Sequence, residues 1–181
     1  MTTAERTHPV LQRWPAALGV GCAVALLALG ADRETVATCV IAAAICYLAA
    51  AALGRPWVAW AAIPATFVVG AIGAPFGAPP WLSIAMSGVL LLVAGLVGQA
   101  SRVALRAQTG ALLVYGAAAV LGLLVSPAVG LVIVGLTLAA HGIWDVIHLR
   151  SGEVVPRSLA EACIALDVPL GLGVIALAVL A

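Results

Sequence analysis

The sequence predicts an all-α membrane protein, a single domain of residues 1–181 folded as a bundle of seven transmembrane helices. Two observations predict this class. First, hydrophobic residues make up 65% of the chain, charged residues make up 8%, and the mean hydropathy is +1.23. A soluble domain carries about 25% charged residues, so this chain lacks the polar surface of a water-facing globule. Second, apolar runs close to the ~20 residues that cross a bilayer recur along the chain.

The breaks between these runs contain arginine, proline or acidic residues, and they divide the chain into predicted spans. The spans cover residues 15–30, 35–53, 56–74, 80–100, 109–125, 127–149 and 158–181. The first, third and fifth are at the short end of the range for a span. Alanine and glycine are abundant in all of them, which suits helices that pack closely inside a membrane.

Two interpretations apply to the first predicted span. Arg6 and Arg13 precede an apolar run, and the small residues before Ala31 resemble the cleavage site of a signal peptide. We favour a retained helix, because the later spans already require a multi-span protein. The second span contains Cys39 and Cys46, which we interpret as small buried residues.

The third, fourth and fifth spans contain few polar groups. Pro64 lies inside the third span and should kink it. A rigid, uncharged turn at 75–80 leads into the fourth span, whose polar residues include Ser83 and Ser87, and the fifth has little beyond Tyr115. Small hydroxyls at such places usually form hydrogen bonds between helices.

The end of the sixth span is the most informative segment. At ~100° per residue, His141, Asp145 and His148 share one helix face, and Trp144 borders it. Imidazoles and a carboxylate on one face are typical ligands of a divalent metal such as zinc. We therefore predict that His141, Asp145 and His148 are metal ligands.

The seventh span returns through the same layer and adds acidic residues. Asp167 lies two residues before Pro169, well inside an apolar span, so we expect Asp145 and Asp167 to be the catalytic carboxylates. Glu161 also fits a capping box with Ser158, in which both side chains bond free amides at the start of a helix. Further candidate site residues are Glu161, Cys163 and Trp144.

The arginines predict how the bundle is oriented. With seven spans, one side of the membrane carries Arg6, Arg13, Arg55, Arg102, Arg106, Arg150 and Arg157. The other side carries Arg33 alone, beside Asp32 and Glu34. This bias predicts a cytoplasmic amino terminus and an outside carboxyl terminus. We expect a multi-pass protein of a bacterial cytoplasmic membrane.

Composition excludes several function classes. The chain contains no lysine, so it cannot form the Schiff base that retinal or pyridoxal phosphate requires. The net charge of +1, without a basic run, argues against binding to nucleic acid. The expected partners are the lipid bilayer and a lipid or hydrophobic small molecule, and an oligomer is compatible with the sequence.

Three functions remain open. In the leading hypothesis, zinc bound at a His/Asp site between the sixth and seventh spans, near the cytoplasmic leaflet, activates water and hydrolyses a lipid-borne ester or amide. In the second, the histidines and aspartates serve a small proton- or ion-coupled transporter. In the third, the chain is a non-catalytic subunit of a membrane complex, and Asp145 fixes helix packing by pairing with neighbouring histidines or arginines.

In topology, seven helices with a histidine-containing site on the cytoplasmic side resemble the progestin and adiponectin receptor and hemolysin III group of zinc membrane hydrolases. That group draws histidines from an early span and a paired H-x-x-x-H from the last. Here the second span has no histidine, and the pattern in the sixth is H-x-x-x-D-x-x-H, from His141 to His148. We therefore transfer none of that group's catalytic residues to this chain.

Overall fold

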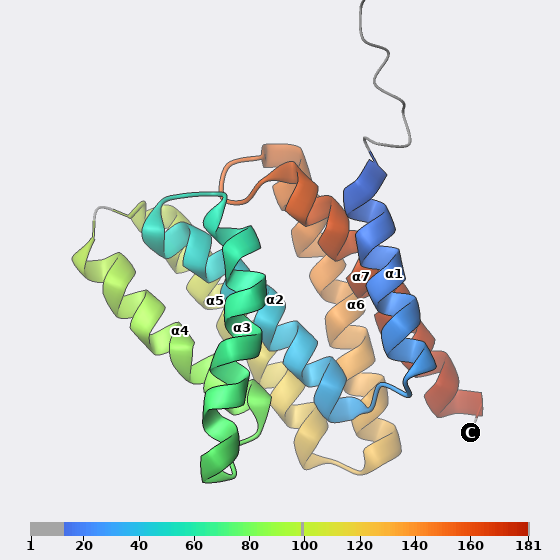
Figure 1. The fold of residues 1–181 in the computed structure, drawn as a ribbon. Coiled ribbons are helices and arrows are strands. Elements are labelled where there is room, and N and C mark those ends of the chain that lie inside the picture. The colour runs from blue at the N-terminus through green and yellow to red at the C-terminus, as the bar shows by residue number, and fades with distance from the viewer. Residues whose placement is uncertain (1–12, 99, 181) are drawn as a thin grey trace, which may run out of the picture.

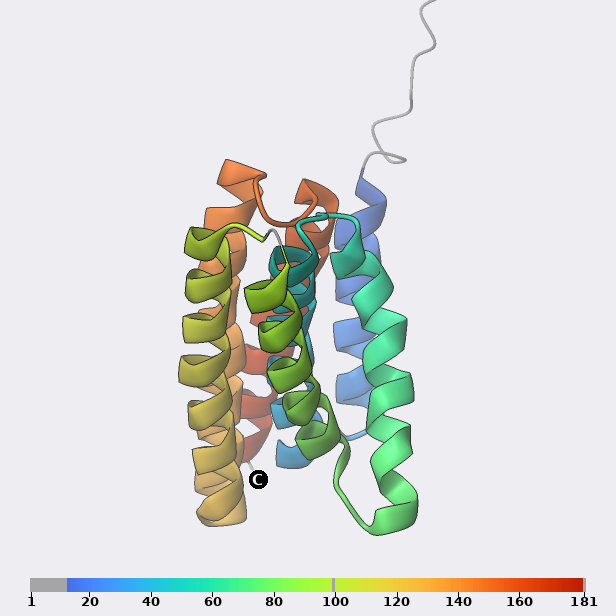
Figure 2. The same cartoon turned by 90° about the vertical axis from the view of Figure 1, so that its left-hand side faces the viewer.

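The structure, a computed structural model, describes residues 13–98 and 100–180. Within them the α-helices are α1 (Trp14–Ala28), α2 (Arg33–Leu53), α3 (Val58–Gly73), α4 (Pro80–Val97), α5 (Arg102–Leu124), α6 (Pro127–Ser151) and α7 (Arg157–Leu180). A short 3-10 helix, η2 (Ala74–Phe76), follows α3 directly. Successive helices run up and down, so their connections alternate between the two ends of the bundle (Figures 1 and 2).

The helices have the length and surface of membrane-spanning segments. Six of those in the described part of the chain are long and apolar enough to cross a membrane. The remaining helix, α1, has 15 residues and is therefore about 22 Å long at 1.5 Å per residue. Large apolar side chains such as Phe67, Leu90 and Leu113 are exposed on the outside of the bundle. By length and composition the chain is a multi-pass membrane protein, as the sequence predicts.

Helix α2 lies at the centre of the bundle. It packs against α3, α4, α5 and α6, and every residue from Ala44 to Ala52 is buried. The helix starts at Asp32, whose carboxylate accepts hydrogen bonds from the Thr35 backbone N–H at 2.8 Å and the Thr35 hydroxyl at 2.7 Å. These bonds favour the ionised form and hold the pKa of Asp32 below its usual value. Gly54 ends the helix in the left-handed region, at φ 61°.

Helix α7 packs against both α6 and α1. Glycine allows α6 and α7 to approach, because a Cβ at Gly135 would lie 2.8 Å from the Gly171 carbonyl oxygen. Gly19 of α1 faces the Ala162 backbone in the same way. Small residues at such contacts let helix backbones come together within a membrane. The polar faces of α6 and α7 are thereby brought into contact.

Most of the arginines in the described residues gather at one end of the bundle, which we call the arginine-rich end. This end carries the start of α1 and the connections α2–α3, α4–α5 and α6–α7, at the top of Figure 1. The described arginines at or beside these segments are Arg13, Arg55, Arg102, Arg106, Arg150 and Arg157. Arg33 lies at the opposite end, and Arg6 lies outside the described residues.

Helix α5 begins at Arg102, well before the predicted start of the fifth span at residue 109. Ser101 caps this start, since its hydroxyl accepts a hydrogen bond from the Ala104 backbone N–H at 3.4 Å. Arginine is a good helix former, so the helix continues past the apolar segment toward water. This extra length adds Arg102, Arg106 and Gln108 to the helix.

Candidate functional site

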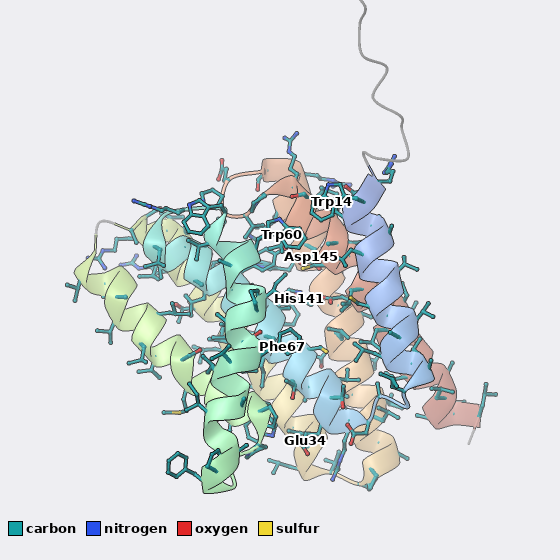
Figure 3. All side chains as sticks on the ribbon, in the orientation of Figure 1. Trp14, Glu34, Trp60, Phe67, His141 and Asp145 are labelled. Carbon is teal, nitrogen blue, oxygen red and sulfur yellow. The ribbon has the colours of Figure 1, made fainter. Side chains whose placement is uncertain are left out.

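The candidate site is a group of three side chains at the middle of the bundle: His141 and Asp145 from α6 and Asp167 from α7. Their side chains are at most 2% exposed. His141 lies ten residues before Ser151 and Asp167 ten residues after Arg157, the residues that end and begin their helices. Both are thus ~15 Å from the arginine-rich end, about half the thickness of a bilayer core. Figure 3 shows His141 near the middle of the bundle and Asp145 closer to the arginine-rich end, both between Trp14 and Glu34.

The spacing of the polar atoms is close to that of a metal site. His141 Nδ1 lies 3.0 Å from Asp167 Oδ2 and 3.5 Å from Asp145 Oδ1. Among the described residues, one ligand atom from each of the three side chains lies within 4.8 Å of the others. Around a tetrahedral zinc ion with bonds of ~2.1 Å, neighbouring ligand atoms are about 3.4 Å apart. Small side-chain adjustments would therefore place all three around one ion.

Two atoms of this group have no hydrogen-bond partner among the described residues, His141 Nε2 and Asp145 Oδ2. Buried polar atoms are nearly always hydrogen-bonded, and an unpaired one costs about 1–3 kcal/mol. Asp145 Oδ2 therefore has a free lone pair for a further ligand, whereas His141 Nε2 lies on the other side of the ring from Nδ1 and would not contact an ion held between Nδ1 and the carboxylates.

The charges of the three side chains also favour a bound cation. In the described part of the chain, Asp145 and Asp167 form ion pairs with His141 and with no arginine. Two ionised carboxylates with one neutral imidazole carry two negative charges, which is costly inside a membrane. Protons or a metal cation would balance them, and one divalent cation would make the group neutral.

Aromatic side chains from two other helices surround His141. Tyr47 of α2 donates its hydroxyl hydrogen bond to Asp145 Oδ1 at 2.6 Å. The Tyr47 ring meets the His141 ring edge-on with centroids 5.7 Å apart, and Tyr115 of α5 does so at 4.9 Å. These contacts restrict the orientation of the imidazole and of the Asp145 carboxylate. If the group holds a metal ion, these aromatic side chains would orient its ligands.

The structure places His148 outside the group of three and gives both of its ring nitrogens other partners. The Trp144 indole N–H donates to Gln108 Oε1 at 3.0 Å, so the Gln108 amide nitrogen must be the atom that faces His148 Nε2 at 2.9 Å. His148 Nε2 therefore accepts that bond, and His148 Nδ1 donates to the Trp144 carbonyl oxygen at 2.8 Å. These bonds leave His148 as a neutral imidazole with no free lone pair. Trp144 contributes by orienting the Gln108 amide that bonds His148.

Two further candidates also have other surroundings. Glu161 accepts a hydrogen bond from Arg13 at 3.4 Å, and the Ser158 hydroxyl accepts one from the Trp60 indole at 3.2 Å. Cys163 packs against the apolar cluster that contains Tyr47. Glu161 thus lies in an ion pair and Cys163 in an apolar contact.

Sequence reasoning missed Tyr47 and Gln108. Tyr47 is a tyrosine in the middle of an otherwise apolar span, which is a usable signal for a polar partner elsewhere. Gln108 stands one residue before the predicted fifth span, so the sequence places it in a connection rather than in a helix. Both come from helices distant in sequence from α6, with separations of 98 and 40 residues from Asp145 and His148.

Comparisons with protein-family models, with curated proteins and with solved structures found no match to this chain. Because a fold alone does not define a function, the functional argument depends on the site itself.

Proposed function

We propose that this protein is a multi-pass transporter of a divalent metal cation, which binds at mid-membrane to His141, Asp145 and Asp167. The observation that carries the proposal is the spacing of three candidate ligand atoms, within 4.8 Å of one another, in a fully buried group of two carboxyl groups and one imidazole. Ionisable residues at this depth commonly mark ion pathways, and the ion sites of transporters commonly lie near the bilayer midplane.

The burial of the group favours transport over lipid hydrolysis. A hydrolase of the kind that the sequence also allows would use the same ligands, but a lipid ester would have to reach the metal. Two cavities of the described structure lie elsewhere, one between α4 and α5 and the other lined by α2, α3 and α4, and no residue of the group lines either. A single cation is small enough to fit between the three side chains after small adjustments. Because the group is buried, the entry and release of the cation then require the bundle to open.

The distribution of arginines supports an orientation for this transporter. We place the arginine-rich end at the cytoplasm, following the positive-inside rule, in the cytoplasmic membrane of a bacterium. With α1 counted as a span, the carboxyl end of α7 is outside. His141 and Asp167 then lie ~15 Å from the cytoplasmic end of their helices and ~20 Å from the outer end, near the midplane where transporters commonly bind ions.

The test is zinc binding and flux with purified protein in liposomes. We expect about one zinc ion per chain and flux into liposomes that contain a zinc-sensitive dye. Asp167→Asn removes a charged ligand and should weaken zinc affinity about 100-fold or more, since even a supporting group contributes 10–100-fold. Glu161→Gln is the matched control, because it neutralises an acid of α7 that pairs with Arg13 and should leave affinity and flux unchanged.

The outcomes separate the competing functions. If the wild-type protein binds neither zinc nor manganese stoichiometrically, the proposal is wrong. Stoichiometric zinc without flux, together with hydrolysis of a lipid ester, would replace transport with the metal-dependent hydrolase. Proton flux without metal binding would replace it with a proton relay.

A further inference from the structure

A groove between α4 and α5 opens at the arginine-rich end of the bundle. Its volume is about 590 Å³, within the range of roughly 300–1,000 Å³ that is usual for small-molecule sites. It is lined by Leu92, Leu96, Arg102, Leu105, Arg106, Thr109, Gly110 and Leu113. It shares no residue with the buried group of His141, Asp145 and Asp167.

The mouth of this groove is positively charged. Arg102 and Arg106 lie one turn apart in the first turns of α5, and both are exposed. Arg102 donates one hydrogen bond to the Leu96 carbonyl oxygen of α4 at 2.8 Å, which holds its guanidinium across the groove. Within the described residues neither arginine pairs with an acid, and a guanidinium has five N–H donors. The amino-terminal end of α5 adds to this positive potential.

The rest of the groove is apolar and has open space. Leu92 of α4 and Leu113 of α5 form part of its walls. A Cβ at Gly110 would meet nothing within 4 Å, so this side of α5 leaves the groove unfilled. Between the two parts, the Thr109 hydroxyl is buried and has no hydrogen-bond partner among the described residues. The groove therefore offers cationic donors at its mouth and an apolar channel beyond them.

We propose that this groove binds one anionic phospholipid of the surrounding bilayer. Its phosphate contacts Arg102 and Arg106, and one acyl chain lies beside Gly110. Guanidinium groups bind phosphate strongly, and basic pockets between membrane helices are suited to anionic head groups. The apolar channel favours a lipid over free phosphate, because inorganic phosphate would leave the channel empty. This site is independent of the proposed cation transport.

The charged part is tested with delipidated full-length protein in detergent, titrated with phosphatidylglycerol or phosphatidylcholine and followed by native mass spectrometry. We expect one tightly bound phosphatidylglycerol and much weaker phosphatidylcholine. The double variant Arg102→Gln, Arg106→Gln should bind phosphatidylglycerol about 10-fold or more weakly, since each arginine contributes electrostatically. Arg55→Gln, at the same end but outside the groove, should bind as the wild type does. Equal binding of the two lipids, or equal loss in Arg55→Gln, would overturn the proposal.

The apolar part is tested by filling the channel. Gly110→Leu should also weaken phosphatidylglycerol binding, whereas Gly21→Leu, an equally open glycine on α1, should not. Inorganic phosphate should fail to displace the lipid at millimolar concentration. If phosphate displaces the lipid fully, or if Gly110→Leu binds lipid as well as the wild type, the groove is an anion site or is not the site at all.

Discussion

The hydroxyl of Tyr47 is bonded to the Asp145 carboxylate on the oxygen that also lies nearest to His141 Nδ1. This bond leaves the other carboxylate oxygen, Oδ2, without a partner among the described residues. A phenol that donates to one oxygen fixes the plane of the carboxylate and the direction of its remaining lone pairs. Tyr47 thereby holds Asp145 in one orientation and leaves its second oxygen available to the proposed cation.

Tyr47→Phe is the sharpest test of this role. The phenylalanine ring preserves the edge contacts with His141 and His148 but removes the hydrogen bond. We expect zinc affinity to fall about 10–100-fold, the usual effect of losing a group that orients a ligand. The free energy of unfolding of the metal-free protein should fall by about 1–3 kcal/mol, because the buried Asp145 Oδ1 loses its hydrogen-bond donor. Zinc titration and denaturant unfolding measure the two effects.

Tyr115→Phe provides the matched control. Its ring also meets His141, but its hydroxyl donates to the Ala140 carbonyl oxygen at 3.3 Å rather than to a carboxylate. Zinc affinity should therefore stay near the wild-type value. If the two variants lose affinity equally, the Tyr47 bond has no special role in orienting Asp145.

At the scale of elements, the pair α6 and α7 determines whether the three ligands meet. His141 and Asp145 are on one helix and keep their spacing wherever that helix goes. Asp167 reaches them across the close contact between Gly135 and Gly171. The separation of the two helix axes therefore determines the distance between His141 Nδ1 and Asp167 Oδ2.

Gly171→Ala tests this dependence. The added Cβ would lie 2.5 Å from the Gly135 carbonyl oxygen and 2.8 Å from the Ala139 nitrogen, so backbone must move. We expect a loss of about 1–3 kcal/mol in stability, as for other overpacked contacts, together with weaker zinc binding. Thermal unfolding in detergent and zinc titration measure these effects.

Gly21→Ala is the control for the glycine substitution, because a Cβ there meets nothing within 4 Å. It should be neutral or stabilising, since alanine is the better helix former by about 0.8–1.0 kcal/mol. Unchanged zinc affinity in Gly171→Ala would show that α6 and α7 can separate without disturbing the ligands.

At the scale of the whole molecule, the connections alternate between the two ends of the bundle. This alternation predicts that the two ends of α7 lie on opposite sides of the membrane. An alkaline phosphatase fused after residue 181 should be active outside the cytoplasm, and a green fluorescent protein inserted in the α6–α7 connection should fluoresce inside it. The physical reason is the gathering of arginines at one end of the bundle. The proposed orientation would be wrong if the phosphatase fused after residue 181 were inactive and a green fluorescent protein fused at the same position were fluorescent.

The helical class and the approximate helix positions could be predicted from the sequence, because apolar runs and charged breaks are local features. The position of His141 and Asp145 on one helix face could also be predicted, because residues four apart lie on the same side of an α-helix. The partners Tyr47 and Gln108 could not, because they depend on which helices lie side by side. A helix in the core and a helix facing lipid are equally apolar, so the central position of α2 leaves no pattern in its sequence.

The central position of α2 also determines the order of events during synthesis. Tyr47 emerges from the ribosome 98 residues before Asp145, an interval of about 5–20 s at 5–20 residues per second. During that time its phenol must be satisfied by water, lipid head groups or the insertion machinery. The last ligand, Asp167, arrives with α7, later still. Binding of the proposed cation would therefore be a late step in the biogenesis of this protein, after the bundle has closed around α2.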